Sequence, residues 1–170
     1  MTAAPSDTLV LFGATGDLAF KKIFPALQAM VQHGTLTVPV VAVGRERRTI
    51  DELRTRVHES LAAHGNFDPV AFDKLARLLR YVQLDYATER GFDELAQTVG
   101  AARPLHYLAI PPGAFETVVR GLQRSNCAAN ARVAIEKPFG RDLASSRQLD
   151  ATLHDVFPES SIFRIDHFLG

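Results

Sequence analysis

The chain has 170 residues, 46% of them hydrophobic, so it can bury one core and is most simply a single domain. Nineteen Lys and Arg balance nineteen Asp and Glu, which excludes a general electrostatic attraction to nucleic acid or to an anionic membrane. Cys127 is the only cysteine, so no internal disulfide can form, and the first residues lack the apolar core of a signal peptide. We therefore expect a cytoplasmic protein whose partner is a small molecule, with no metal site and no membrane span.

The first predicted strand, 8–12, leads into a turn that contains two glycines. Gly13 can adopt backbone angles that are closed to residues with a Cβ, and Gly16 lets the main chain approach an anion. The unpaired N–H groups of the following helix would then face a pyrophosphate. The residues predicted to hold the phosphates are Gly13, Ala14, Thr15, Gly16, Asp17 and Leu18. A tight strand-to-helix turn without a ligand is the alternative interpretation of this pattern alone.

Short β-branched runs alternate with helical segments along the whole chain, which is typical of βαβ units. The expected strands are Thr8–Phe12, Val38–Val43, Tyr81–Leu84, Leu105–Ile110, Arg132–Ile135 and Ser161–Ile165. Residues that start helices lie between them: the capping box Thr49 and Glu52 before a helix to about Ala63, the pair Asp68-Pro69, and Asp142 before a helix to about Val156. This order predicts an α/β fold with a Rossmann-type, doubly wound parallel sheet, forming one NAD(P)-binding domain over residues 1–170.

An arginine cluster follows the second predicted strand, at the position where NAD-binding folds place an acid for the ribose 2′-hydroxyl. A guanidinium at Arg45 suits a 2′-phosphate better than a hydroxyl, so the sequence predicts NADP as the coenzyme. A solvated charged turn is the alternative for this segment, above all for Arg47 and Arg48. Glu46 could instead contact the ribose, which leaves NAD open as a second coenzyme.

Three further strand ends carry candidate site residues. Ala109, Ile110 and Pro111 lie at the end of the fourth strand, where a proline-containing loop is expected to line the coenzyme groove; prolines that simply end the strand are the alternative. Lys137 follows the fifth strand beside an acid and a proline. Asp166 and His167 follow the sixth strand; as neighbours on an extended segment they should point to opposite faces and serve different partners.

Four segments, taken together, resemble glucose-6-phosphate dehydrogenase. They are Gly13–Lys22, Tyr107–Pro112, Glu136–Leu143 and Arg164–Gly170. They occur in order over nearly the whole chain, and the last, Arg-Ile-Asp-His-Phe-Leu-Gly, is the most specific. The resemblance implies hydride transfer from C1 of glucose 6-phosphate to NADP, which gives 6-phosphogluconolactone at the start of the pentose phosphate pathway.

The resemblance also implies roles for single residues. The glycine turn and Arg45 match coenzyme-binding positions, and Lys22, Lys137 and His167 match substrate-binding positions. Lys22 matches a lysine that is close to the coenzyme as well, and Lys137 is also expected to contact the coenzyme. Asp166 matches an aspartate that orients the catalytic histidine of the family. Phe20 stands where many members have a lysine, and Phe168 where many have a tyrosine.

Members of the family continue past the last segment into a second domain that carries the histidine base. The resemblance therefore implies that this chain is the coenzyme domain without that catalytic domain, inactive alone, which either self-associates or pairs with a separate C-terminal half. A stand-alone NADP-binding module is the alternative. An extended short-chain dehydrogenase is disfavoured, because no Tyr-x-x-x-Lys pair lies on a predicted helix.

Overall fold

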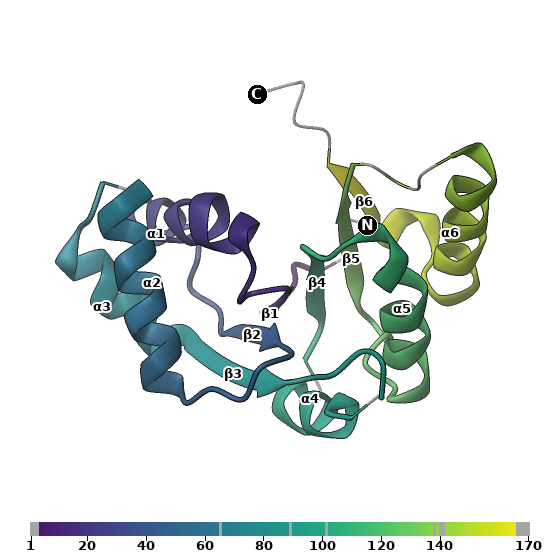
Figure 1. Cartoon of the computed structure of the whole chain (residues 1–170), viewed down its shortest axis with the longest axis horizontal. Coiled ribbons are helices and arrows are strands. Elements are labelled where there is room, and N and C mark those ends of the chain that lie inside the picture. Colours follow the sequence, from purple (N-terminus) through teal and green to yellow (C-terminus); the bar gives the residue numbers. More distant parts are fainter. Residues whose placement is uncertain are drawn as a thin grey trace.

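A computed structural model of the chain describes residues 4–64, 66–88, 90–100, 102–137, 139 and 142–165, and these residues form one parallel sheet flanked by helices (Figure 1). The strands of the described part are β1 (Thr8–Phe12), β2 (Val40–Gly44), β3 (Leu79–Gln83), β4 (Pro104–Leu108), β5 (Arg132–Glu136) and β6 (Ile162–Ile165). The helices are α1 (Phe24–Gln32), α2 (Ile50–His64), α3 (Pro69–Leu78), α4 (Phe92–Val99), α5 (Phe115–Arg124) and α6 (Leu143–Val156). A π-helical turn, Ala19–Ile23, precedes α1, and short 3-10 turns cover Pro112–Ala114 and Glu159–Ser161.

The strand order is β3-β2-β1-β4-β5-β6, with every neighbouring pair parallel. This order confirms the predicted doubly wound sheet of the Rossmann type. The chain reverses its direction of travel across the sheet between β1 and β4. In such folds the crevice outside the carboxyl ends of these two strands is the usual ligand site.

The predicted helix starts are confirmed by their hydrogen bonds. Glu52 Oε2 accepts from the backbone N–H of Thr49 at 2.6 Å, and Thr49 Oγ1 accepts from the N–H of Glu52 at 3.2 Å. Asp68 Oδ1 accepts from the first-turn amides of α3, and Asp142 Oδ1 accepts from the Ser145 amide at 2.8 Å. Each carboxylate or hydroxyl thus pairs an amide that a helix end leaves unpaired.

Five of the predicted strands had boundaries that were wrong by one or two residues, because tertiary pairing sets them; β5, for example, ends at Glu136 rather than Ile135. β2 begins at Val40 rather than Val38 and includes Gly44, and β3 begins at Leu79, where α3 ends and Leu79 pairs with Val40. β4 covers Pro104–Leu108, since the chain beyond it turns towards Gly13. β6 begins at Ile162, after the 3-10 turn that takes in Ser161.

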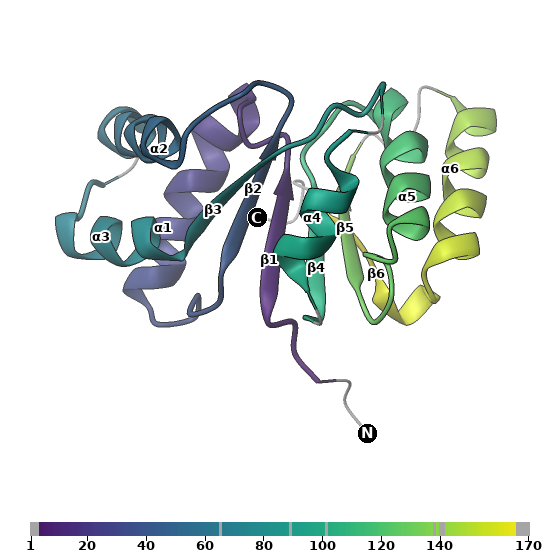
Figure 2. The same ribbon diagram turned by 90° about the horizontal axis from the view of Figure 1, so that it is seen from below.

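Two apolar clusters hold the helices on opposite faces of the sheet (Figure 2). On one face, α1, α2 and α3 pack on β1, β2 and β3 through residues such as Phe24, Leu53 and Leu75, which are fully buried. On the other face, α4, α5 and α6 pack through residues such as Leu95 and Phe115. Side chains of a strand alternate between faces, so β1, β2 and β3 contribute to both layers.

The first face is covered unevenly. Within the part of the chain that the structure describes, no helix packs on this face of β4, β5 and β6. An apolar groove of about 730 Å³ lies there, between α1 and the bare strands. Its strand side includes Leu105, Tyr107, Ala134, Phe163 and Ile165, and Phe163 is 47% exposed.

The imidazole of His106, in β4, is fully buried in the other layer. Its Nε2 lies 2.8 Å from the carbonyl oxygen of Cys127, to which it donates, and the edge of the ring meets Phe12 at a centroid distance of 5.9 Å. Nδ1 is buried and has no hydrogen-bond partner among the described residues. Burial therefore disfavours the imidazolium and lowers the pKa of His106 from 6.5 to about 4.

His106 should make the fold sensitive to acid. Its pKa is lower in the folded chain than in the unfolded chain, so its contribution to stability is fully present above pH 6.5 and is lost as the pH falls towards 4. The whole effect corresponds to about 3 kcal/mol of unfolding free energy. Urea denaturation between pH 7.5 and 4.5 should show that the free energy of unfolding falls less steeply in His106→Gln than in the parent chain.

His154 provides the matched control, because hydrogen bonds to the Asp150 backbone and to Glu159 raise its pKa. Its contribution runs in the opposite direction, being present at low pH and lost as the pH rises through the folded pKa. His154→Gln should therefore not make the acid dependence shallower. Equal pH slopes for the parent and His106→Gln would contradict the assignment to His106.

Candidate functional site

The loop between β1 and α1 is held in a closed turn by its own backbone. Gly13 has φ +77°, and the Gly16 N–H donates to the Gly13 carbonyl at 2.9 Å. The Ala14 N–H donates to Val43 at the end of β2, at 3.0 Å. A Cβ on Gly13 would lie 2.0 Å from the Ala109 carbonyl oxygen, so no other residue fits this position.

The outer side of the loop is open. A Cβ on Gly16 would meet only the Gly13 carbonyl oxygen, at 3.2 Å, and Gly16 is exposed. The helical turn begins at Asp17 and Leu18, whose first-turn amides lack partners within a helix. The side chain of Asp17 is exposed and pairs with Lys21 at 3.2 Å. The loop thus offers backbone N–H donors at a helix N-terminus, the arrangement that binds phosphate.

A groove of about 350 Å³ joins this loop to the ends of β4 and β5. Gly16, Asp17 and Leu18 line one wall, and the loop of Ala109, Ile110 and Pro111 lines another. Glu136 and Lys137 line the third side. The structure therefore brings seven of the predicted site residues together around one opening, with their direct neighbours Leu108, Pro112 and Glu136.

Lys137 begins the segment after β5, where its backbone N–H lies 3.4 Å from the Ile165 carbonyl oxygen in a hydrogen bond to β6. Its neighbour Glu136 accepts a hydrogen bond from the hydroxyl of Tyr107 in β4. Burial and this carboxylate raise the pKa of Tyr107, so its hydroxyl stays protonated. The pair fixes the ends of β4 and β5 beside Lys137.

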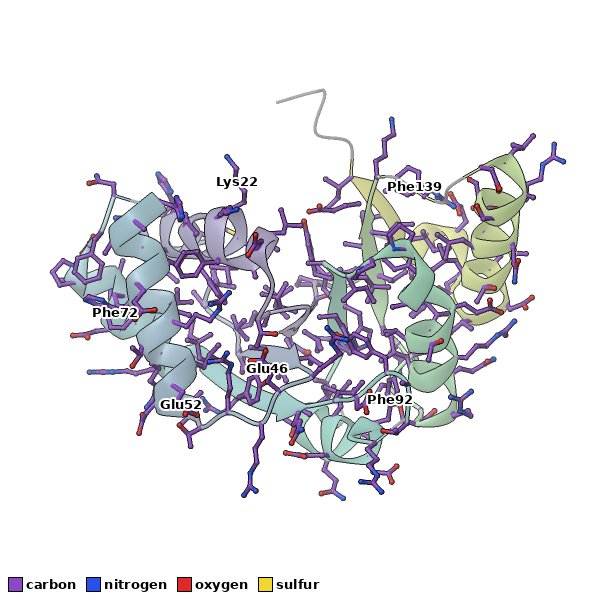
Figure 3. The ribbon with its side chains drawn as sticks, in the orientation of Figure 1. Lys22, Glu46, Glu52, Phe72, Phe92 and Phe139 are labelled. Carbon is purple, nitrogen blue, oxygen red and sulfur yellow. The ribbon has the colours of Figure 1, made fainter. Side chains whose placement is uncertain are left out.

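Lys22 lies in the π-helical turn and lines the larger apolar groove together with Leu18, Tyr107 and Glu136. Figure 3 shows the exposed Lys22 on the same side of the molecule as Phe139, which follows the β5 end. The two grooves share Leu18 and Glu136. Lys22 and Lys137 therefore line adjoining grooves.

Arg45 lies at the other end of the site, directly after β2. Gly44 packs so tightly that a Cβ there would be 2.7 Å from Thr15 Cγ2, which brings the β2 end against the phosphate loop. Arg45 is exposed, and its carbonyl accepts from Gln83 at 3.1 Å. Glu46, which sequence analysis considered for the ribose, is bound through its carboxylate to Arg48 at 2.5 Å.

Tyr86 was missed by the sequence analysis. Its ring packs on Phe12 at a centroid distance of 6.3 Å, and burial raises its pKa to about 12, against the opposing effects of the Gly13 backbone and the Arg45 charge. Tyr86 thus lies between the glycine turn and the β2 end. Its position at the carboxyl end of β3 is the signal that could have identified it.

Arg56 of α2 was also missed, and it contacts the loop from behind, with Nη2 2.8 Å from the Thr15 carbonyl oxygen.

Asp166 and His167 lie outside the described residues. The segment that leads to them is fixed by Arg164, which pairs with Asp150 of α6 at 2.6 Å and with Glu159 at 2.9 Å. In the described ranges we find no group of three His, Cys, Asp or Glu side chains placed to hold a metal ion, and none of the helices is suited by length and hydropathy to span a membrane.

Known proteins are similar to this chain in sequence and in fold. A sequence model of the family described as glucose-6-phosphate dehydrogenase, NAD binding domain, matches residues 10–170. Glucose-6-phosphate 1-dehydrogenase 1 of Mycobacterium tuberculosis is 42% identical over 166 residues, which cover 97% of this chain and 36% of that protein. The Saccharomyces cerevisiae glucose-6-phosphate 1-dehydrogenase is 38% identical over 180 residues, with the same shares covered.

Solved structures agree with the sequence relatives. The crystal structure of glucose-6-phosphate 1-dehydrogenase from Mycobacterium avium superposes with a TM-score of 0.93 at 43% identity, over 98% of this chain and 37% of that one. A glucose-6-phosphate dehydrogenase in complex with its substrate glucose 6-phosphate superposes with a TM-score of 0.86 at 32% identity, over 99% and 38%. This chain thus spans little more than a third of the length of the relatives that it matches, and over that third it belongs to the glucose-6-phosphate dehydrogenase family as its NAD-binding domain.

Proposed function

We propose that this chain is the coenzyme-binding part of a glucose-6-phosphate dehydrogenase, an enzyme that oxidises C1 of glucose 6-phosphate to the 6-phosphoglucono-1,5-lactone in the pentose phosphate pathway. The observation that carries the proposal is the open glycine turn at the switch point between β1 and β4, with Arg45 at the end of the adjacent strand. The coenzyme, when bound, supplies the acceptor for the hydride. The chain's own residues bind and orient it.

We assign the coenzyme-binding roles from the positions of the residues around the groove. The turn formed by Gly13, Ala14, Thr15, Gly16, Asp17 and Leu18 receives the pyrophosphate, with amides of its helix start, such as those of Asp17 and Leu18, as the donors. Ala109, Ile110 and Pro111 form the opposite wall, and Lys137 closes the groove. Arg45 holds a 2′-phosphate. The Glu46 carboxylate, which would suit a 2′-hydroxyl, is already paired with Arg48, so we propose NADP before NAD.

The substrate roles belong to the rim between the two grooves. Lys22 and Lys137 line two grooves that share Leu18 and Glu136, and their positive charges suit a sugar phosphate. We assign His167 to the same phosphate and Asp166 to orienting a histidine base in the remaining part of the enzyme.

We also propose the cytoplasm as the location, as in the relative named glucose-6-phosphate 1-dehydrogenase 6, cytoplasmic, of Arabidopsis thaliana.

Replacing Arg45 by Ala should weaken NADP binding by about 10- to 100-fold, because a charge-assisted hydrogen bond contributes roughly 1.5–3 kcal/mol. NAD lacks the 2′-phosphate, so its affinity should change by less than about twofold. Titration of the purified chain with both coenzymes measures the two dissociation constants. Arg47→Ala, an exposed arginine of the same loop, is the control and should leave the ratio of the constants unchanged. Equal affinity of the parent chain for NADP and NAD would contradict the NADP preference.

The chain alone should not turn over glucose 6-phosphate. We place the general base and the remaining sugar contacts in the part of the family that this chain does not span, and a missing base costs about 10²–10⁴-fold in rate. A loosely placed substrate costs about a further 10²-fold. Adding a polypeptide with the remaining length of a mycobacterial relative should restore the formation of NADPH, measured by absorbance.

Each polypeptide alone is the control in that assay. Binding of NADP by the chain without restored turnover in the mixture would favour the alternative of a stand-alone coenzyme-binding module. Turnover by the chain alone would show that it contains its own base, and Asp166→Asn would then be the first variant to measure.

The isolated chain should self-associate through the bare face of β4, β5 and β6. An exposed apolar groove of this size is typical of a surface that another polypeptide covers. Phe163→Ser should shift sedimentation towards the monomer, because Phe163 is the exposed aromatic residue of that groove. Leu143→Ser is the control, since Leu143 is 67% exposed outside the groove. A monomeric parent chain at high concentration would contradict self-association.

A further inference from the structure

One face of α2 contacts the back of the phosphate loop, residues 13–18. Arg56, Ser60 and His64 are spaced by four residues, so they lie on one face of the helix. Arg56 Nη2 donates to the carbonyls of Thr15, at 2.8 Å, and Gly16, at 3.4 Å. The three side chains together contact the loop and the π-helical turn that follows it.

Phe20 is the common partner of that helix face. The Arg56 guanidinium lies over its ring, 4.8 Å from the centroid, and the His64 ring meets it edge-on at 5.5 Å and 83°. The Ser60 hydroxyl donates to its backbone carbonyl. Since a guanidinium stacks on an aromatic ring through its planar face, Phe20 fixes the plane in which Arg56 presents its N–H groups.

The contacts of Arg56 determine where the loop amides point. In a trans peptide the C=O and the following N–H point in opposite directions. Because the Gly16 carbonyl turns towards Arg56, and also accepts from the Phe20 N–H at 3.2 Å, the Asp17 amide is directed away from α2. Asp17 lines the groove, so the amide is directed towards the side on which a phosphate would lie.

The guanidinium is committed to this position. Its Nε is buried and has no hydrogen-bond partner in the described part of the chain. A buried donor without a partner is unfavourable. The same guanidinium makes two carbonyl contacts through Nη2 and stacks on the ring of Phe20.

We propose that Arg56 is a positioning residue for coenzyme binding, which orients the backbone amides of the phosphate loop from behind. The inference rests on the proposed function, because it requires that the loop binds a pyrophosphate. Arg56 acts on the part that NADP and NAD share, whereas Arg45 acts on the 2′-phosphate. The two arginines therefore affect affinity and preference separately.

The test compares Arg56→Met with Arg54→Met on the same helix. Arg54 also tethers α2 to another element by a carbonyl, since its Nε donates to Ala76 of α3 at 3.2 Å, but it does not contact the loop. Both variants remove one guanidinium and one tether of α2. They should lower thermal stability to a similar degree and differ in coenzyme binding.

Titration with NADP and NAD should show that Arg56→Met weakens both by about tenfold and leaves their ratio unchanged, while Arg54→Met binds as the parent does. Arg56→Lys should be intermediate, because an ammonium can donate to the Thr15 carbonyl but lacks the planar face for Phe20. Without coenzyme, amide hydrogen exchange over residues 14–18 should be faster in Arg56→Met only.

Unchanged affinity for both coenzymes in a folded Arg56→Met variant would overturn the inference while the proposed function stands. A change in the NADP to NAD ratio would overturn it as well, since Arg56 would then act on the 2′-phosphate. A parent chain that binds neither coenzyme would overturn the proposed function, and the inference with it.

Discussion

The site depends on the close contact between Gly13 and the Ala109 carbonyl. A Cβ at Gly13 would lie 2.0 Å from that oxygen, and φ is +77°, so both space and backbone conformation require glycine. The contact is possible because β1 and β4 pair in register, with Phe12 opposite Leu108, and both chains leave the sheet at the same level. The phosphate loop and the loop after β4 consequently form facing walls of one groove. A side chain at residue 13 would push these walls apart, whether or not a ligand is bound.

Local signals predicted the elements well wherever the cause was local. The carboxylates of Asp68 and Asp142 and the Thr49–Glu52 pair act within three residues of themselves, and the helices begin where they stand. Strand boundaries were less predictable, because pairing partners set them. Leu79 belongs to β3 through its pairing with Val40, which no pattern near Leu79 indicates.

The same distinction divides the predicted site residues. Strand ends were recognisable, and parallel strands bring their carboxyl ends to one edge, so the residues of the groove could be predicted as a group. Tyr86 also follows a strand end, but the rule does not single it out, and Arg56 lies outside the rule altogether. Tyr86 follows β3 as an ordinary apolar aromatic, and only its packing on Phe12 places it beside Gly13. Arg56 lies within a helix of mixed charge, and its role depends on the carbonyl of Thr15, 41 residues away.

The bare face of the sheet and the rim that we propose for the substrate are physically one surface. The apolar groove over β4, β5 and β6 is bordered by Lys22, Tyr107 and Glu136, and Glu136 also borders the coenzyme groove with Lys137. A polypeptide that covers this face to bury Phe163 and its neighbours must therefore lie against the lysines at the rim. The same contact would remove water from around their charges and strengthen their attraction to a phosphate, since electrostatic interactions grow as the local dielectric falls. Burial of the apolar face and completion of the anion site would then be coupled, because one docking surface serves both.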